Sequence, residues 1–241
     1  MQIGYWVSSC QRDSVSQMHT PSLYEVYQKL YDAFGPQNWW PGESPFEVLV
    51  GAVLVQNTSW SNVEKAICRL REEGLMCPQK LYRLKDGELE ELVKPVGYYR
   101  IKARRLKNVL HYLVAKHDGS LEKMFALPIH QLRQELLDIN GIGPETADSI
   151  ILYAGNLPTF VVDAYTLRIC ARHGWVDSQT DYHMLKDFFE SQLEPDVALY
   201  NEYHALLVRL GKDYCKTRPR CDECPLRCYL PDGGPYEPDF G

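Results

Sequence analysis

Four of the eight cysteines lie close together near the end of the chain, with the spacing Cys215-x5-Cys221-x2-Cys224-x3-Cys228. Closely spaced thiols form either disulfides or a metal site. The first twenty residues lack the basic start and apolar core of a secretory signal, so we expect a cytoplasmic protein. Because that compartment is reducing, the spacing favours a metal site over a disulfide framework.

A second stretch whose residues could bind a ligand or do chemistry is NGIGPETADS, residues 140–149. Gly141-Ile142-Gly143 interrupts two amphipathic stretches, and Pro144 suits the first turn of a new helix because it lacks an N–H and has a fixed φ. Unpaired N–H groups at a helix start can hold a phosphate, and glycine lets the backbone approach it closely. An ordinary turn between helices is the alternative. Further along, Asp163 precedes a helical pattern that it can cap.

The elements that must position these residues are helical by pattern. Apolar residues recur every three or four positions, which predicts helices over 22–34, 61–70, 81–93, 106–113 and 132–139. The apolar run 46–55, FEVLVGAVLV, cannot be assigned by periodicity to a buried helix or a buried strand, and its aliphatic residues favour a strand. No alternating pattern of useful length occurs elsewhere, so the sequence predicts an all-α fold.

Charge gives a mixed indication of the partner. The net charge of −6 argues against a nucleic acid, because phosphate binding uses clustered Lys and Arg. Basic residues do cluster locally, although a solvated helix face is the alternative. The clusters are Arg100, Lys102, Arg104, Arg105 and Lys107, and later Lys216, Arg218 and Arg220. No apolar run approaches the ~18 residues that cross a membrane, so we expect no membrane partner.

Together these motifs resemble the endonuclease III superfamily of DNA glycosylases, in which a Gly/Pro-rich helix–hairpin–helix is followed by an aspartate. The resemblance covers about residues 22–228 and implies that Asp163 is catalytic, because a carboxylate can stabilise positive charge on the sugar and orient water. Bifunctional members carry a lysine that forms a Schiff base with the sugar. Glu145 occupies that position here. The resemblance therefore implies a monofunctional glycosylase, with Glu145 a favourable acid in the first turn of a helix.

Three tryptophans suggest the substrate. Trp39 and Trp40 precede GAVLVQNT, and Trp60 follows it by two residues, an arrangement that resembles the 3-methyladenine glycosylase branch. An alkylated purine such as 3-methyladenine or 7-methylguanine is cationic and leaves easily, so aromatic stacking can select it, and Trp60 is the first candidate for that stack. Packing in the core is the alternative role. The resemblance also places Gln56 in the space left by the flipped nucleotide and Tyr98 at the wedge position.

By the same resemblance, Cys215, Cys221, Cys224 and Cys228 hold a [4Fe–4S] cluster, although the outer spacings are shorter than usual by one residue before the central pair and two after it. Four thiolates can also hold zinc, which remains the alternative. The cluster would hold the loop of Lys216, Arg218 and Arg220 rigid and offer it to phosphate. His204 resembles a family helix position, and a packed histidine is its alternative.

The implied architecture is two helical lobes with the lesion in the cleft between them. One is a helical barrel, 43–150, with the hairpin; the other combines 22–42 with 151–228 and carries the cysteines, which leaves 1–21 as an extension and 229–241 as a tail. We expect a monomer that binds double-stranded DNA containing a damaged base. The alternatives are a glycosylase of the same fold for a mismatched thymine or an oxidised pyrimidine, and a non-enzymatic helix–hairpin–helix DNA-binding protein.

Overall fold

The structure is a computed structural model that describes residues 21–237, and this part of the chain contains twelve α-helices and no β-strand. The all-α prediction is confirmed. The helices are α1 Leu23–Phe34, α2 Pro45–Leu54, α3 Trp60–Glu72, α4 Pro78–Arg83, α5 Asp86–Leu92, α6 Tyr99–His117, α7 Leu121–Phe125, α8 Ile129–Leu137, α9 Pro144–Ser149, α10 Ala164–Arg172, α11 Tyr182–Glu190 and α12 Val197–Asp213. A π-helical turn, Ile150–Ala154, continues α9.

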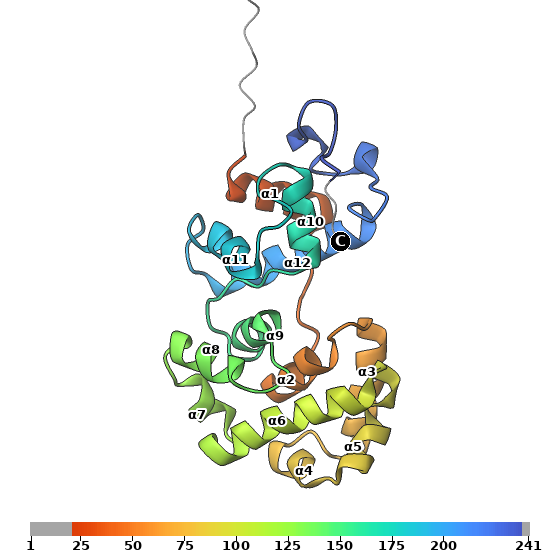
Figure 1. Ribbon diagram of the computed structural model, residues 1–241, viewed down its shortest axis with the longest axis vertical. Coiled ribbons are helices and arrows are strands. Elements are labelled where there is room, and N and C mark those ends of the chain that lie inside the picture. The colour runs from red at the N-terminus through yellow and green to blue at the C-terminus, as the bar shows by residue number, and fades with distance from the viewer. Residues whose placement is uncertain (1–20, 238–241) are drawn as a thin grey trace, which may run out of the picture.

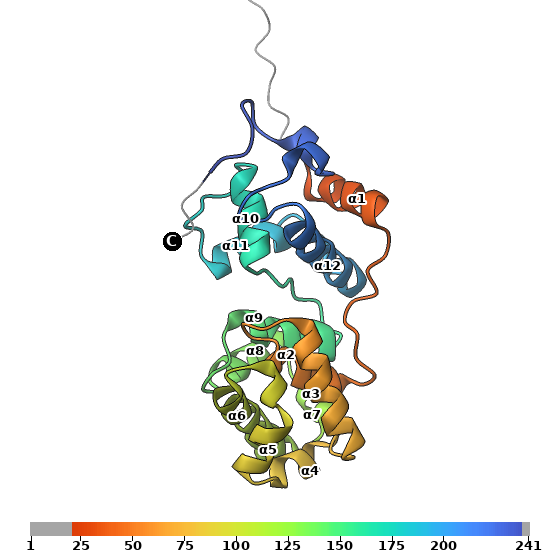
Figure 2. The ribbon, with the colours of Figure 1, turned by 90° about the vertical axis from the view of Figure 1, so that its right-hand side faces the viewer.

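The helices form two lobes, each with its own buried core (Figure 1). One lobe contains α2 to α9, and the other contains α10, α11 and α12 together with α1 from the start of the chain. Two segments connect the lobes, one between α1 and α2 and one leading to α10 (Figure 2). The second segment delivers Asp163 to the junction of the lobes.

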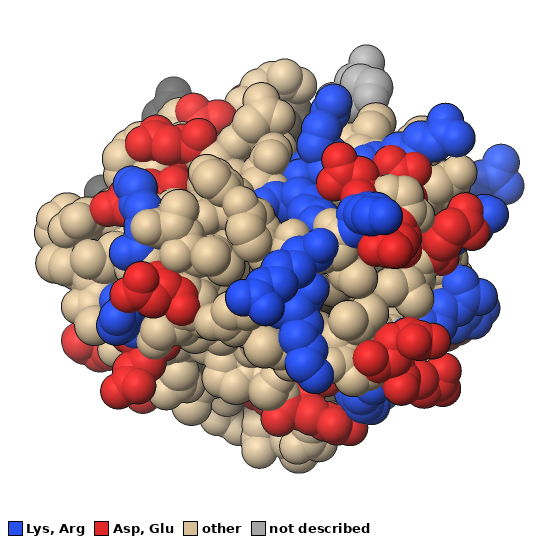
Figure 3. Space-filling model, turned by 90° about the horizontal axis from the view of Figure 1, so that it is seen from below, with Lys and Arg blue, Asp and Glu red and all other residues tan. Residues whose placement is uncertain are grey.

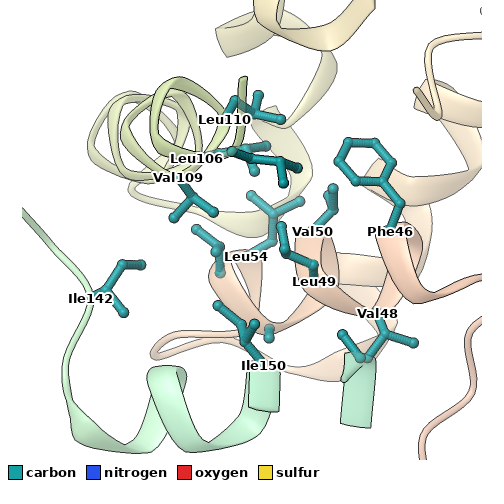
Figure 4. Close-up of a cluster of buried hydrophobic side chains, with 14 of the residues drawn as sticks. Phe46, Val48, Leu49, Val50, Leu54, Leu106, Val109, Leu110, Ile142 and Ile150 are labelled. Carbon is teal, nitrogen blue, oxygen red and sulfur yellow. The ribbon is translucent and has the colours of Figure 1, made fainter. Parts of the chain in front are cut away.

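Helix α2 contains most of the apolar run 46–55, which the sequence could not assign to a helix or a strand. The preference for a strand is wrong. Ser44 caps the helix, since its hydroxyl accepts a hydrogen bond from the Glu47 N–H at 3.2 Å. Every residue from 46 to 54 is buried, because α3, α6, α9 and the π-helical turn surround α2. Side chains such as Leu49, Leu54 and Leu106 meet in this core (Figure 4). A helix covered on all sides is apolar all round, so periodicity cannot identify it.

The predicted helix over 81–93 is two helices, which corrects the boundary inferred from the pattern. Leu84 is extended, with a ψ of 145°, and Lys85 is the N-cap of α5, where its backbone N–H donates to Glu88 Oε2 at 2.9 Å. The break lets α4 and α5 both pack on α6, with Leu81 and Leu89 fully buried. Both halves keep their apolar spacing, so the pattern could not show the break.

The last described residues, 231–237, return to the second lobe. The Tyr236 backbone N–H donates to the Arg172 carbonyl at 3.0 Å, and the Tyr236 ring lies against Gly174. Of the predicted extension and tail, residues 1–20 and 238–241 lie outside the described part of the chain. Across residues 21–237, no helix has the length and apolar character needed to cross a membrane.

Candidate active site

A cleft of about 1080 Å³ lies at the junction of the lobes and brings together most of the predicted site residues. The residues singled out in the sequence that line this cleft are Trp39, Trp40, Gln56, Trp60, Arg105, Gly141, Ile142, Gly143, Glu145, Asp163 and His204. These residues are spread over more than 160 positions of the chain. Tyr98 and the four cysteines lie outside the lining of this cleft.

The hairpin turn between α8 and α9 contains two glycines with different roles. Gly141 has a φ of +95°, which favours glycine, and a Cβ added there would lie 2.4 Å from Cγ of Arg105. Gly143 has an ordinary φ of −94° and no atom within 4 Å of an added Cβ. Ile142 is buried and anchors the turn to the barrel core (Figure 4). Gly141 is therefore required by the fold of the turn, whereas Gly143 leaves open space at the start of α9.

Asp163 is half-buried and caps α10, as predicted. Its Oδ1 accepts hydrogen bonds from the Thr166 backbone N–H at 2.8 Å and from the Thr166 hydroxyl at 2.9 Å. Both bonds use the same oxygen, which leaves Oδ2 for partners in the cleft. The cap also fixes the side-chain rotamer, because the carboxylate must stay over the first turn of the helix.

Glu145, in the first turn of α9, faces the same cleft. Its side chain is open to the cleft, so water reaches it, but the surrounding walls remove part of its hydration. This desolvation, and then the nearby charge of Asp163, raise the pKa of Glu145 to about 7. Two carboxyl groups in one cleft, one of them with its pKa displaced towards neutrality, are typical of a site that separates an ionised role from a protonated one.

The three predicted tryptophans form one aromatic wall. The ring centroids of Trp40 and Trp60 are 5.1 Å apart and nearly perpendicular, and those of Trp39 and Trp40 are 5.3 Å apart. Gly51 of α2 makes room for them, since a Cβ there would lie 3.4 Å from both Trp40 and Trp60. Each ring is only partly buried. The wall is therefore packed within itself and still open to the cleft.

Gln56 is tied to the hairpin. Its amide nitrogen donates to the Thr146 hydroxyl at 2.9 Å and to the Gly141 carbonyl at 3.3 Å, and its amide oxygen accepts from the Arg105 guanidinium. The Arg105 side chain in turn packs on Gly141. In this arrangement the amide group of Gln56, just after α2, joins helix α6, the hairpin and the first turn of α9.

Tyr98 lies at the start of α6, with its side chain 76% exposed and its backbone in the left-handed region at a φ of +44°. The turn beneath it is held by Lys102, whose amine donates to the Val96 carbonyl at 2.7 Å. Lys102 is 2% exposed, and burial, followed by repulsion from Arg105, lowers its pKa to about 8. An exposed aromatic ring on a braced turn is a rigid projection from the barrel lobe.

The basic residues of 100–107 do not form one surface patch. Lys102 is buried, and Lys107 donates to the carbonyls of Tyr82 and Leu84. Arg100 and Arg104 are exposed. The lower face of the barrel lobe carries a short band of Lys and Arg with Asp and Glu on both sides (Figure 3). The helical period explains the difference, because neighbouring basic residues in α6 point in different directions.

The four predicted metal ligands lie in one loop after α12. Cys215, Cys221 and Cys224 line a small cavity, and Cys228 is near enough to Cys224 for an electrostatic interaction between the two thiols. Burial and the neighbouring thiols raise the pKa of Cys224 to about 11. Within residues 21–237 no three potential ligands converge at metal-binding distance. In the loop between them, Lys216 and Arg218 are exposed, and Arg220 pairs with Glu223 at 2.5 Å.

Residues in and next to the cleft were missed in the sequence. Lys212 lines the cleft, and its amine lies 6.0 Å from the centre of the Trp39 ring. Tyr153 is not part of the lining but packs on Trp40, with ring centroids 5.1 Å apart and planes tilted by 36°. Lys212 lies two helical turns after His204 on the same face of α12, a spacing that could have identified it. His204 is buried and donates from Nδ1 to the Val161 carbonyl at 2.9 Å, so it is a packed histidine at the edge of the cleft.

Comparison with known proteins agrees with this geometry. Residues 50–195 match the family model described as HhH-GPD superfamily base excision DNA repair protein. A putative DNA repair glycosylase of Methanocaldococcus jannaschii is 46% identical over 207 residues, covering 85% of this chain and 94% of the relative. Endonuclease III of Thermotoga maritima is 33% identical over 184 residues, covering 76% and 81%.

Among solved structures, the H. pylori 3-methyladenine DNA glycosylase bound to 1,N6-ethenoadenine matches with a TM-score of 0.68 and 29% identity, covering 78% of this chain and 96% of that chain. The family match spans more than half of the chain and includes both the hairpin and Asp163. The chain therefore belongs to the HhH-GPD superfamily of base excision DNA repair proteins, as an endonuclease III-like DNA glycosylase.

Proposed function

We propose that this protein is a monofunctional DNA glycosylase that removes an alkylated purine, such as 3-methyladenine or 7-methylguanine, and leaves an abasic site. The observation that carries the proposal is the composition of the cleft, which is lined both by the tryptophan wall and by two carboxyl groups, Asp163 and Glu145. The start of α9 offers a carboxyl group where a lyase would need an amine.

The chemistry follows from these groups. A flipped base that stacks on Trp60 brings the C1′ atom of its sugar towards Asp163. As the N-glycosidic bond breaks, its electron pair leaves with the base and positive charge builds on the sugar, where the Asp163 carboxylate stabilises it. Water then adds to C1′ and gives its proton to the carboxylate, which completes hydrolysis. A cationic alkylated base needs no additional proton to leave, so stacking is its main requirement.

In this proposal Gln56 and Tyr98 act on the duplex, Gln56 filling the space of the flipped nucleotide and Tyr98 wedging between bases. Gln56 must then exchange its bonds to Thr146, Gly141 and Arg105 for bonds to DNA. The backbone around Gly143, with exposed Lys216 and Arg218, would contact phosphates.

For the four-cysteine loop we propose a [4Fe–4S] cluster held by Cys215, Cys221, Cys224 and Cys228, with zinc as the alternative. Support comes from the donor set, because four cysteines lie within one short loop. Their thiolates would repel one another, so a bound cation is needed to keep all four ionised. When bound, the group would supply a rigid cross-link of the loop. The loop carries Lys216 and Arg218, which the cross-link would position.

A panel of lesion duplexes tests the substrate. Duplexes containing 3-methyladenine, 7-methylguanine, a mismatched thymine or an oxidised pyrimidine are incubated with the protein, and released base and alkali-labile sites are measured. We expect release of the methylated purines and no release by Asp163→Asn. Preferential release of the thymine or the oxidised pyrimidine would establish the alternative glycosylase. Binding without any base release would establish the non-enzymatic helix–hairpin–helix protein.

A further inference from the structure

The segment that leads to Asp163, residues 159–162, is buried, yet it belongs to no helix. Its polar backbone groups are bonded to side chains of the second lobe. The Phe160 N–H donates to Glu190 Oε1 at 2.7 Å, and the Phe160 carbonyl accepts from Lys186 at 3.3 Å. The Val161 carbonyl accepts from His204. Side chains therefore take the place of secondary structure in this segment.

The same segment is also held by the barrel lobe. The Thr159 hydroxyl, in the segment itself, donates to Asp148 Oδ1 at 3.3 Å, and the Tyr182 hydroxyl donates to Asp148 Oδ2 at 2.9 Å. Asp148 is fully buried, and Arg133 donates to both of its oxygens, at 2.8 and 3.1 Å. A chain of hydrogen bonds thus runs from α8 and α9, through Asp148, to α11 and to the segment before Asp163.

Asp148 lies on α9, the helix that begins at the hairpin, so this chain links the hairpin to Asp163. A buried ion pair is weak evidence for stability, since apolar residues of the same shape often stabilise a fold equally well. What apolar packing cannot supply is a directed hydrogen bond between the barrel lobe and the segment before Asp163. The Asp148 carboxylate provides directed bonds instead, because its two oxygens accept from Arg133, from the Tyr182 hydroxyl and from the Thr159 hydroxyl of the segment.

We propose that Asp148 and Tyr182 are positioning residues for Asp163, an inference that rests on the proposed glycosylase function. They hold the backbone before Asp163 at a fixed place relative to the hairpin. When the hairpin grips a phosphate, the geometry of DNA sets where C1′ of the flipped nucleotide lies, and the link places the Asp163 carboxylate beside it. A displacement of about 1 Å in such a group can cost on the order of 100-fold in rate.

Tyr182→Phe tests the link with a small change, since it keeps the ring and the Arg133–Asp148 ion pair and removes one hydroxyl. The matched control is Tyr112→Phe, because Tyr112 is buried away from the cleft, which Tyr182 lines, and its hydroxyl bonds to His117 at 3.1 Å. Four quantities are measured: the single-turnover excision rate, the affinity for a duplex with a non-cleavable abasic analogue, the thermal midpoint, and amide hydrogen exchange over residues 156–167.

The expected pattern separates positioning from general loss of structure. Tyr182→Phe should lower the excision rate by about 10- to 100-fold while the affinity and the thermal midpoint match those of Tyr112→Phe. Exchange in the segment before Asp163 should become faster in Tyr182→Phe alone. Asp148→Asn should also lower the rate, and the double variant should be no slower than the slower single variant, because both act through one link.

Three results would overturn the inference. The first is a wild-type excision rate in Tyr182→Phe, and the second is an equal loss of rate in Tyr112→Phe. The third is a loss of rate that is matched by the loss of DNA affinity, since that would make the tyrosine a binding residue. Failure of the proposed function would give a different result, because the wild-type protein would then release no base from any duplex of the panel.

Discussion

Substituting alanine at the two hairpin glycines separates DNA contact from folding. The positions lie two residues apart in one turn but differ in geometry: Gly141 has a positive φ and a crowded Cβ direction, whereas Gly143 has an ordinary φ and open space. We therefore expect Gly141→Ala to destabilise the protein and Gly143→Ala to leave its stability intact. Gly143→Ala should nevertheless weaken DNA binding, because its methyl group projects where a phosphate would approach α9.

The magnitudes follow from the same geometry. At Gly141 a positive φ costs an L-residue about 1–2 kcal/mol, and a Cβ that lies 2.4 Å from Arg105 Cγ adds overpacking of about 1–3 kcal/mol. A total near ~3 kcal/mol lowers the thermal midpoint by roughly 6–12 °C in a protein of this size. Gly143→Ala should keep the midpoint or raise it slightly, since alanine restricts the unfolded chain.

The assay combines thermal unfolding with DNA binding at one salt concentration. For Gly143→Ala we expect DNA affinity to fall about tenfold, which corresponds to ~1.4 kcal/mol. This free energy is no larger than that of one hydrogen bond to a charged phosphate oxygen. Measurement at matched salt is required because phosphate contacts depend steeply on ionic strength. Unchanged affinity in Gly143→Ala would remove the hairpin from the interface. Unchanged stability in Gly141→Ala would refute the geometric argument.

Four further predictions concern the cleft and the cysteine loop. Trp60→Ala should lower excision of methylated purines by roughly 5- to 150-fold, from the ~1–3 kcal/mol of base–aromatic stacking, whereas Trp60→Phe should retain much of the activity; full activity in folded Trp60→Ala would return Trp60 to a packing role. Borohydride should trap no adduct with lesion or abasic DNA, and strands should break only after alkali; a trapped adduct would show that an amine attacks the sugar. The folded protein raises the pKa of Glu145 from its ordinary value of 4.5 to about 7. The folded protein therefore binds this proton more tightly than the unfolded chain does, and stability falls as pH rises from 4.5 to 7. Glu145→Gln should gain thermal stability relative to wild type between pH 5 and 8, and a constant difference between the two proteins would contradict the shift. Purified protein should be brown and contain iron and sulfide, and colourless protein with stoichiometric zinc would establish the alternative metal.

Local features of the sequence determined the helical class, the turn at Gly141-Ile142-Gly143, the helix start at Pro144 and the cap at Asp163. Each depends on a few neighbouring residues: the spacing of apolar side chains, the fixed φ of proline, or a short side chain that reaches the next turn. The spacing of the four cysteines is local in the same sense and predicts a metal site, and both this site and the choice between an iron–sulfur cluster and zinc stay predictions.

Only the tertiary structure decided what depends on partners distant in the chain. The run 46–55 is a helix because other helices cover it on all sides, and the pattern 81–93 breaks because both halves pack on α6. Lys102 is buried because a carbonyl of the preceding turn accepts from it. The bonds of Asp148 to Thr159 and Tyr182 join residues up to 34 positions apart. The free energy of such contacts depends on three-dimensional distance and burial, which short-range sequence patterns do not contain.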